Sequence, residues 1–257
     1  MGGSSRCASR LGALVLLAAC ASTPSPGPGL LPDVDPNDPL AGTKLMQQGQ
    51  TLVAEGDIAA GMARFRKAQK LQPGNPTVYN VIGMAQLQQG KAADALQSFN
   101  DALSLAPNYA DARSNRGAAY VQLKQYSMAE SDFLQVLSDD TYANRAGVYF
   151  NLGSLYFALG NLGGAEDNLR RSSKLAGPVE AYFMLGQVEE RLGKTSLAET
   201  AYRDAVSHAP ERPDIILGLA NFLQAKGQKE EARTLYRRVI DLAPNSQEAQ
   251  QARARLE

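Results

Sequence analysis

The sequence predicts an all-α fold in which six consecutive pairs of antiparallel helices stack into a solenoid. The first observation is a small residue that recurs in steps of 34, 34, 36, 33 and 34, at Gly49, Gly83, Gly117, Gly153, Gly186 and Ala220. The second is a small residue followed four positions later by a large one, in the pairs Gly61/Phe65, Ala95/Phe99, Ala129/Phe133, Ala165/Leu169, Ala198/Tyr202 and Ala232/Tyr236. The third is a closing proline in five of the six units, at Pro73, Pro107, Pro178, Pro210 and Pro244.

The repeated unit is cleanest at residues 76–109, and each marker position has a physical reason. Gly83 and Ala95 are small where two antiparallel helices are expected to cross, so that their backbones can approach. Phe99 fills the space between the pair and its neighbour, and Pro107 ends the second helix because proline cannot continue it. An aromatic residue (Tyr79) and Ile-Gly on one helix, then A-x₃-F and Pro on the next, resemble the tetratricopeptide repeat. The resemblance implies a superhelix.

The register places the six repeats at residues 42–245, with first helices starting near 42, 76, 110, 146, 179 and 213. Residues 246–257 are polar enough to form a capping helix over the last apolar face, which a solenoid requires. The step between repeats three and four is two residues longer than the preceding steps, and Thr141 takes the place of the closing proline. Either a helix extends there or a loop bulges.

Residues 1–19 are predicted to be a targeting segment. Arg6 and Arg10 precede a short apolar core at 11–18, which is too short to span a bilayer because about 20 apolar residues are needed. The core ends in Leu17-Ala18-Ala19-Cys20, which resembles a bacterial lipobox. That resemblance implies cleavage before Cys20 and lipid chains on it, and several chains anchor a protein stably where one does not. The alternative is an ordinary secretory signal cleaved near Ala19, which leaves Cys20 as a free thiol.

Residues 20–41 are predicted to be a tether that carries the lipidated cysteine. Pro, Gly, Ser and Asp dominate this stretch, and such a composition cannot build a core. The alternative to an inert tether is that Leu30-Leu31 packs against the first repeat. Ala21 follows the cysteine where an Asp would resemble an inner-membrane retention signal, so we expect the periplasmic face of the outer membrane.

Composition and motifs argue against catalysis. Lysine plus arginine and aspartate plus glutamate each total 26, which gives no reason to expect nucleic acid. Both cysteines, Cys7 and Cys20, precede the repeats, and the one histidine, His208, lies at a helix end where a structural role is expected. Nucleotide, hydrolase and zinc motifs are missing, and acidic pairs such as Glu189-Glu190 are interpreted as solvated helix surface. We therefore expect a binding protein with no cofactor, metal or small-molecule substrate.

The expected binding surface is the concave face, which first helices line in tetratricopeptide superhelices. Its predicted positions are apolar in both halves of the chain: Met46, Val53, Met84, Leu87, Val121, Phe150, Phe157, Phe183 and Leu217. Polar residues interrupt this lining at Gln50, Asn80, Ser114 and Asn221. A contiguous apolar groove is typical of a site for an apolar or amphipathic partner segment. The alternative is that these side chains belong to the core between repeats.

A lipobox, a short tether and six such repeats resemble the pilotin lipoproteins of type IV pilus biogenesis (the PilF, PilW and Tgl type). The most specific part is Asp140-Thr141, Arg145, Val148 and Asn151-Leu152-Gly153, which is similar to that family's D-T…R…V-F-x-N-L-G stretch. The resemblance implies a partner, the pilus secretin, whose outer-membrane localisation and assembly into a ring the protein would promote. The alternative function is a general periplasmic adaptor that gathers cell-wall enzymes.

Overall fold

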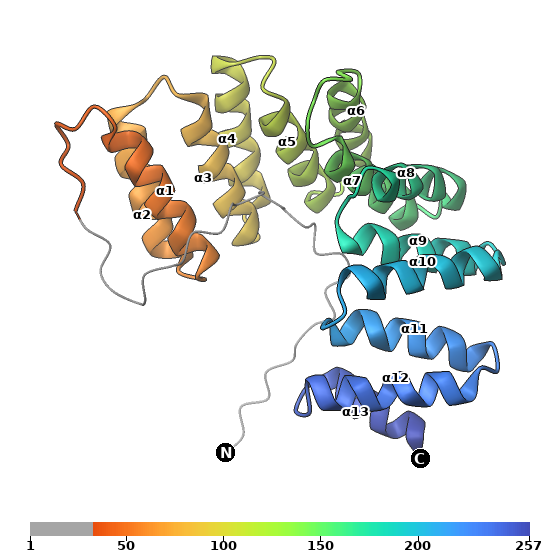
Figure 1. Ribbon diagram of the computed structural model, residues 1–257. Helices are drawn as coiled ribbons and strands as arrows, with labels where there is room; N and C mark the ends of the chain where they lie inside the picture. Colours follow the sequence, from red (N-terminus) through yellow and green to blue (C-terminus); the bar gives the residue numbers. More distant parts are fainter. Residues whose placement is uncertain (1–32) are drawn as a thin grey trace, which may run out of the picture. The chain divides into compact units, whose positions relative to one another are not determined.

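The computed structural model describes residues 33–257, and these residues form thirteen α-helices and no strand (Figure 1). The predicted targeting segment, the predicted lipidation site Cys20 and Leu30-Leu31 lie outside this range. The described residues fall into two compact bodies, one ending at Ala143 and the other beginning at Asn144. No helix between residues 33 and 257 is both long and apolar enough to cross a bilayer. The predicted all-α class, with six helix pairs and a final helix, is confirmed.

The N-terminal body contains three helix pairs: α1 (Ala41–Ala54) with α2 (Ile58–Leu71), α3 (Pro76–Gln88) with α4 (Ala92–Leu105), and α5 (Ala110–Gln122) with α6 (Tyr126–Leu137). Local chemistry fixes several helix starts. Asp57 accepts a hydrogen bond from Ala60 N at 2.9 Å, and Asn75 accepts one from Thr77 N at 3.0 Å. Pro76 occupies the first turn of α3, where its missing N–H is not needed. Val34, in the described end of the predicted tether, packs against the core of the first repeat.

The marker glycines make room for the large residue on the partner helix. A Cβ atom at Gly83 would lie 2.5 Å from Cε1 of Phe99, and one at Gly117 would lie 2.6 Å from Cε1 of Phe133. Both phenylalanines are completely buried. The small residue at this position is therefore required by an aromatic ring, in addition to the close approach of backbones that the sequence suggested.

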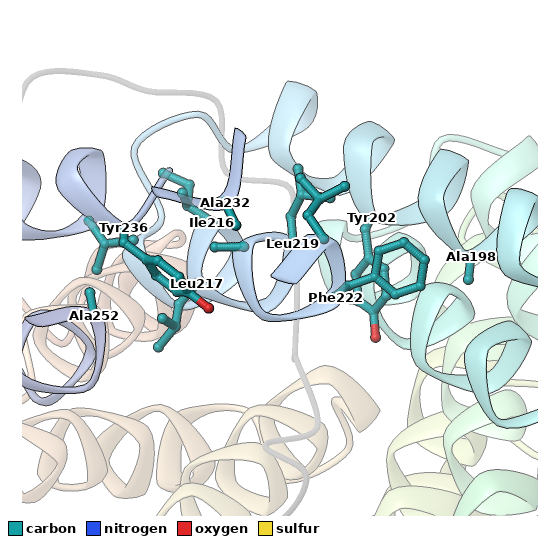
Figure 2. Close-up of a cluster of buried hydrophobic side chains, with 12 residues drawn as sticks. Ala198, Tyr202, Ile216, Leu217, Leu219, Phe222, Ala232, Tyr236 and Ala252 are labelled. Carbon is teal, nitrogen blue, oxygen red and sulfur yellow. The ribbon is translucent and has the colours of Figure 1, made fainter. Parts of the chain in front are cut away.

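The C-terminal body contains the pairs α7 (Arg145–Ala158) with α8 (Leu162–Lys174), α9 (Val179–Arg191) with α10 (Thr195–His208), and α11 (Pro213–Ala225) with α12 (Lys229–Leu242), followed by α13 (Gln247–Leu256). Figure 2 shows part of its core, in which Tyr236 and Ile216 are completely buried. Ala252 of α13 belongs to the same cluster. Ser246 accepts a hydrogen bond from Ala249 N at 3.1 Å and starts the capping helix.

The long junction between repeats three and four is a loop. α6 ends at Leu137, and a turn follows in which the Thr141 N–H and hydroxyl both donate to Oδ1 of Asp139, at 2.9 and 2.6 Å. Tyr142 donates its hydroxyl hydrogen to Oδ1 of Asp111 at 2.5 Å, which ties this turn to α5. Of the two alternatives that the sequence left open, the loop is the one observed.

Within each body the first helices of neighbouring repeats contact one another. α3 contacts both α1 and α5, and α7 contacts α9. Each second helix packs on its own first helix and on the first helix of the next repeat in the same body. First helices therefore form the inner layer of each body, which is where the sequence placed the binding surface.

Candidate partner-binding surface

Four of the nine predicted groove residues are buried in the core. The exposed fractions are 8% for Met46, 4% for Leu87, 3% for Phe150 and 6% for Leu217. Met46 packs in the core of the first repeat, Phe150 in a cluster of α7 to α10, and Leu217 in the cluster around α11 and α12. For Met46, Leu87 and Phe150 the expectation of an open groove position is wrong, because these side chains are buried among the helices. Leu217 is also largely buried, and it borders only the cavity described below.

The other five predicted residues are half-buried and lie on first helices. Val53, Met84 and Val121 lie on α1, α3 and α5, and we call them the N-terminal apolar set. Phe157 and Phe183 lie on α7 and α9, and we call them the C-terminal apolar set. These five side chains retain surface that a partner can cover.

Amide side chains connect α3 to α5 near the N-terminal apolar set. Nδ2 of Asn115 donates to Oδ1 of Asn80 at 3.0 Å, and Nδ2 of Asn80 approaches the hydroxyl oxygen of Tyr109 at 3.4 Å. Asn80 is only 5% exposed, and burial raises the pKa of Tyr109. This pairing could not be predicted from the sequence, because Asn80 and Asn115 are 35 positions apart and lie in different repeats.

A cavity of about 360 Å³ opens among α9, α10 and α11 of the C-terminal body. Three residues that the sequence placed in the lining, Phe183, Leu217 and Asn221, border it, and the sequence missed the other six: Gln187, Glu190, Tyr202, Asp214, Gly218 and Phe222. Cavities of this volume are at the small end of the range that small ligands and side chains occupy. The signal for it in the sequence was the repeat register, which placed Phe183, Leu217 and Asn221 on the expected inner side of the first helices.

Three aromatic rings pack together beside this cavity. The rings of Phe183 and Tyr202 meet edge to face, with centroids 5.5 Å apart and an interplanar angle of 66°. The ring of Phe222 is tilted against Tyr202 at 5.2 Å, and Figure 2 shows these two rings side by side. The hydroxyl of Tyr202 donates to Oε2 of Glu190 at 2.9 Å. Burial, with the Glu190 carboxylate nearby, raises the pKa of Tyr202 well above its usual value.

A second cluster in the C-terminal body is made of charged side chains. Arg170 donates to Glu166 Oε1 at 2.6 Å and to Glu189 Oε1 at 2.8 Å, and Lys194 donates to Glu166 Oε2 at 2.6 Å. Glu166 is 6% and Glu189 only 2% exposed, so the interpretation of Glu189 as solvated surface is wrong. This cluster joins α8 to α9 and contributes to the packing of repeats four and five.

His208 and the acidic side chains are possible metal ligands by residue type. Between residues 33 and 257 no three His, Cys, Asp or Glu side chains are placed to hold a metal ion. His208 is exposed at the end of α10, stacks on the ring of Tyr182 at 4.4 Å, and its Nδ1 lies 2.8 Å from the carbonyl oxygen of Asp204.

Comparison with known proteins agrees with the repeat register. Residues 46–112 and 83–141 match one family model described as tetratricopeptide repeat, and residues 146–177 and 191–256 match two further models with the same description. A lipoprotein NlpI homolog of Haemophilus influenzae is 34% identical over 82 residues, which are 31% of this chain and 26% of that protein. The chain thus spans about a quarter of the length of this curated relative.

Two solved structures resemble the chain over most of its length. Pseudomonas aeruginosa PilF superposes with a TM-score of 0.70 at 17% identity, over 83% of this chain and 96% of PilF. PilW, described as a widely conserved type IV pilus biogenesis factor, superposes with a TM-score of 0.72 at 22% identity, over 82% of this chain and 97% of PilW. At these identities the likeness shows a shared fold. The helix pairs, the repeat register and these matches together show that the chain is a tetratricopeptide-repeat protein.

Proposed function

We propose that this protein is an outer-membrane lipoprotein pilotin that binds the type IV pilus secretin and promotes its localisation and multimerisation there. The observation that carries the proposal is the apolar surface that first helices keep open to a partner in each body. Val53, Met84 and Val121 provide it in the N-terminal body, and Phe157 and Phe183 provide it in the C-terminal body. The PilF and PilW folds, matched over nearly their whole lengths, and the resemblance of residues 140–153 to the pilotin family support the same function.

The chemistry of a secretin explains why such a surface is useful. A subunit that will end in lipid has an amphipathic segment that aggregates if it stays exposed in the periplasm. Half-buried methionine, valine and phenylalanine side chains can cover the apolar side of that segment, and covering each large side chain contributes about 1.5–3 kcal/mol before ordering costs. Met84 adds adaptability, because its unbranched side chain fits surfaces of different shape.

Charging the inner layer is expected to abolish secretin binding. The variant Met84→Glu/Val121→Glu/Phe157→Glu places carboxylates on α3, α5 and α7 at half-buried positions. Each buried charge opposes contact with an apolar segment, so a pull-down from membranes of the native host should lose at least about 90% of the secretin, which corresponds to a loss of roughly 1.4 kcal/mol or more. Circular dichroism should remain helical. Phe150 is left unchanged, because a charge at this buried position would disturb the fold instead.

The matched control places the same charges on second helices. Leu105 on α4, Leu134 on α6 and Leu197 on α10 are 44%, 49% and 48% exposed, so Leu105→Glu/Leu134→Glu/Leu197→Glu adds three carboxylates without touching the inner layer. This control should retain the secretin. If the inner-layer variant also retains the secretin, the two apolar sets are not the secretin-binding surface.

We also propose that lipids on Cys20 hold the protein at the periplasmic face of the outer membrane. A Cys20→Ala variant with a secretory signal should then fractionate with soluble periplasmic proteins. Because secretin would no longer be delivered to the membrane, the yield of heat-resistant secretin rings on gels should fall by about tenfold, as expected when stable anchoring is lost. Normal ring assembly by the soluble variant would make the anchor dispensable.

A second candidate function is a periplasmic adaptor for cell-wall enzymes. The local match to a lipoprotein NlpI homolog favours it, because that match, over 82 residues, is higher in identity than the pilus structures. The pull-down separates the two functions. A pilotin should bring down a secretin, whereas an adaptor should bring down peptidoglycan hydrolases or synthases.

A further inference from the structure

We propose that the cavity among α9, α10 and α11 is a subsite for a basic side chain, lysine or arginine, of the bound partner segment. The inference rests on the proposed function, because it assigns one side chain of the segment that the inner layer holds. It adds a charged contact to a surface for which the sequence predicted only apolar and uncharged polar residues.

The cavity has an aromatic wall that is held in place by packing. Phe183 is half-buried and meets Tyr202 edge to face at 5.5 Å. A Cβ atom at position 218 would collide with the Phe183 ring, so Gly218 lets this ring lie against α11. Leu217 completes the apolar part of the lining. Such a wall can cover the methylene stem of a long side chain, which lysine and arginine bury while their charged ends stay polar.

The polar part of the lining is acidic. Glu190 and Asp214 are its ionisable carboxyl groups, and none of the lining residues is lysine, arginine or histidine. Asp214 is already neutralised by Arg212, whose Nε and guanidinium NH₂ group donate to the carboxylate at 2.8 and 2.6 Å. Glu190 makes no ion pair among residues 33–257, and its one recorded partner is the Tyr202 hydroxyl at 2.9 Å. Its carboxylate charge is therefore available to a cation.

The amides of Gln187 and Asn221 complete the polar lining. Oδ1 of Asn221 accepts a hydrogen bond from the Tyr236 hydroxyl at 2.9 Å, and this contact fixes which side of the amide faces away from α12. Amide groups of this kind can bind the peptide backbone on either side of an anchored side chain. The arrangement therefore suits a residue within a peptide better than a free ion.

Nearby rings in the same body already carry cations. The guanidinium carbon of Arg191 lies 4.4 Å from the ring centroid of Phe157, and Nζ of Lys226 lies 5.5 Å from that of Phe222. Cations are attracted to aromatic faces at these distances. An acidic partner side chain would instead meet Glu190 with like charge, and a purely apolar one would desolvate that carboxylate without supplying an opposite charge. Charge complementarity thus selects a basic residue.

The test compares two small probes that differ in charge and have the same shape. N-acetyl-arginine amide and its neutral analogue N-acetyl-citrulline amide are titrated into the full chain while the backbone amide signals of Gly218 and Asn221 are followed by NMR. The arginine probe should give saturable shifts at these signals and bind about tenfold more tightly than the citrulline probe, as a charge-assisted contact predicts. Equal binding of the two probes, or shifts located elsewhere, would overturn the proposal.

A charge-neutral variant tests the role of Glu190 directly. Glu190→Gln keeps a side-chain oxygen for the Tyr202 hydroxyl and removes the charge, so arginine binding should weaken at least about fivefold while citrulline binding stays the same. Glu211→Gln is the control, because Glu211 is an exposed acid in the turn after α10. Unchanged arginine binding by Glu190→Gln would also overturn the subsite.

The two proposals fail in different ways. If the arginine probe does not bind but the secretin is retained in the pull-down, the basic subsite is wrong and the pilotin function stands. If the probe binds as expected but no secretin is retained, the subsite stands and serves a different partner.

Discussion

Replacing Arg170 by methionine is expected to lower the free energy of unfolding of the C-terminal body by about 3 kcal/mol near neutral pH. The change keeps the apolar stem and removes the guanidinium that contacts Glu166 at 2.6 Å and Glu189 at 2.8 Å. Glu189 then has no ion-pair partner. Its buried Oε2 atom already has no hydrogen-bond partner in the native chain. Breaking a buried ion pair usually lowers the free energy of unfolding by about 3–5 kcal/mol. We take the low end of that range, because the Arg170 side chain is 37% exposed and solvent screens part of the interaction. Urea unfolding followed by circular dichroism measures the change.

The loss should shrink as the pH falls. In the native chain burial raises the pKa of Glu189, and the hydrogen bond from Arg170 opposes that rise. Burial would also raise the pKa of Glu166, but hydrogen bonds from Lys194 and Arg170 hold it below its usual value. Without Arg170 both folded-state pKa values rise. A carboxyl group whose pKa is higher in the folded state destabilises that state above the unfolded pKa, and protonation removes the penalty. The deficit should therefore be largest at about pH 7 and smaller at about pH 4.5.

Arg203→Met is the matched control for this prediction. Arg203 also bridges two carboxylates, with Glu199 at 2.9 Å and Glu231 at 2.6 Å, and its side chain is 42% exposed. Its partners are in contact with water, so the loss should be no more than about 1 kcal/mol. Adding Glu189→Gln to Arg170→Met should recover part of the stability. Equal losses from Arg170→Met and Arg203→Met would show that burial does not set the strength of the Arg170 cluster.

Replacing Phe133 by alanine is expected to lower the free energy of unfolding of the N-terminal body by about 3–5 kcal/mol. Phe133 is completely buried and its Cε1 lies 2.6 Å from the position that a Cβ atom of Gly117 would occupy. The truncation leaves a cavity that a glycine on the facing helix cannot fill. Urea unfolding of the full chain should show the loss as an earlier transition of the N-terminal body, with the second body unaffected if the two unfold separately.

Two variants at the same place separate packing from general effects of substitution. Leu134 is the next residue on α6 and is 49% exposed, so Leu134→Ala should change the free energy of unfolding by no more than about 0.5 kcal/mol. Phe133→Leu should cost only about 1–1.5 kcal/mol, because repeat four uses a leucine, Leu169, against its own marker glycine. A loss from Leu134→Ala as large as that from Phe133→Ala would contradict this account of the glycine–aromatic pair.

The repeat architecture could be predicted from the sequence because its determinants are local and periodic. Each marker glycine and the large residue that covers it lie within one helix pair, about 16 positions apart, as Gly83 and Phe99 do. Proline and polar caps end and start helices through contacts within a few residues. Because the same pattern recurs in six units, each helix assignment is supported by the equivalent positions of the other repeats. The six helix pairs and the final helix could therefore be predicted from the repeat pattern.

The binding surface could be predicted only in part, because burial on a first helix depends on neighbouring repeats. A first helix contacts its own partner helix and the helices before and after it, so apolar residues on its inner side and on its packing sides have nearly the same spacing. Phe150 and Phe157 lie on the same helix, yet Phe150 is core and Phe157 keeps open surface.

Contacts between repeats also decided where the charged groups lie. Glu189 and Glu190 are adjacent in the sequence, but Glu189 faces Arg170 of α8 and Glu190 faces Tyr202 of α10. The sequence by itself determined the helix pairs, their register and the lack of a catalytic motif. The tertiary structure decided which apolar and acidic side chains remain open to a partner, because that choice depends on distances between residues that are far apart in the chain.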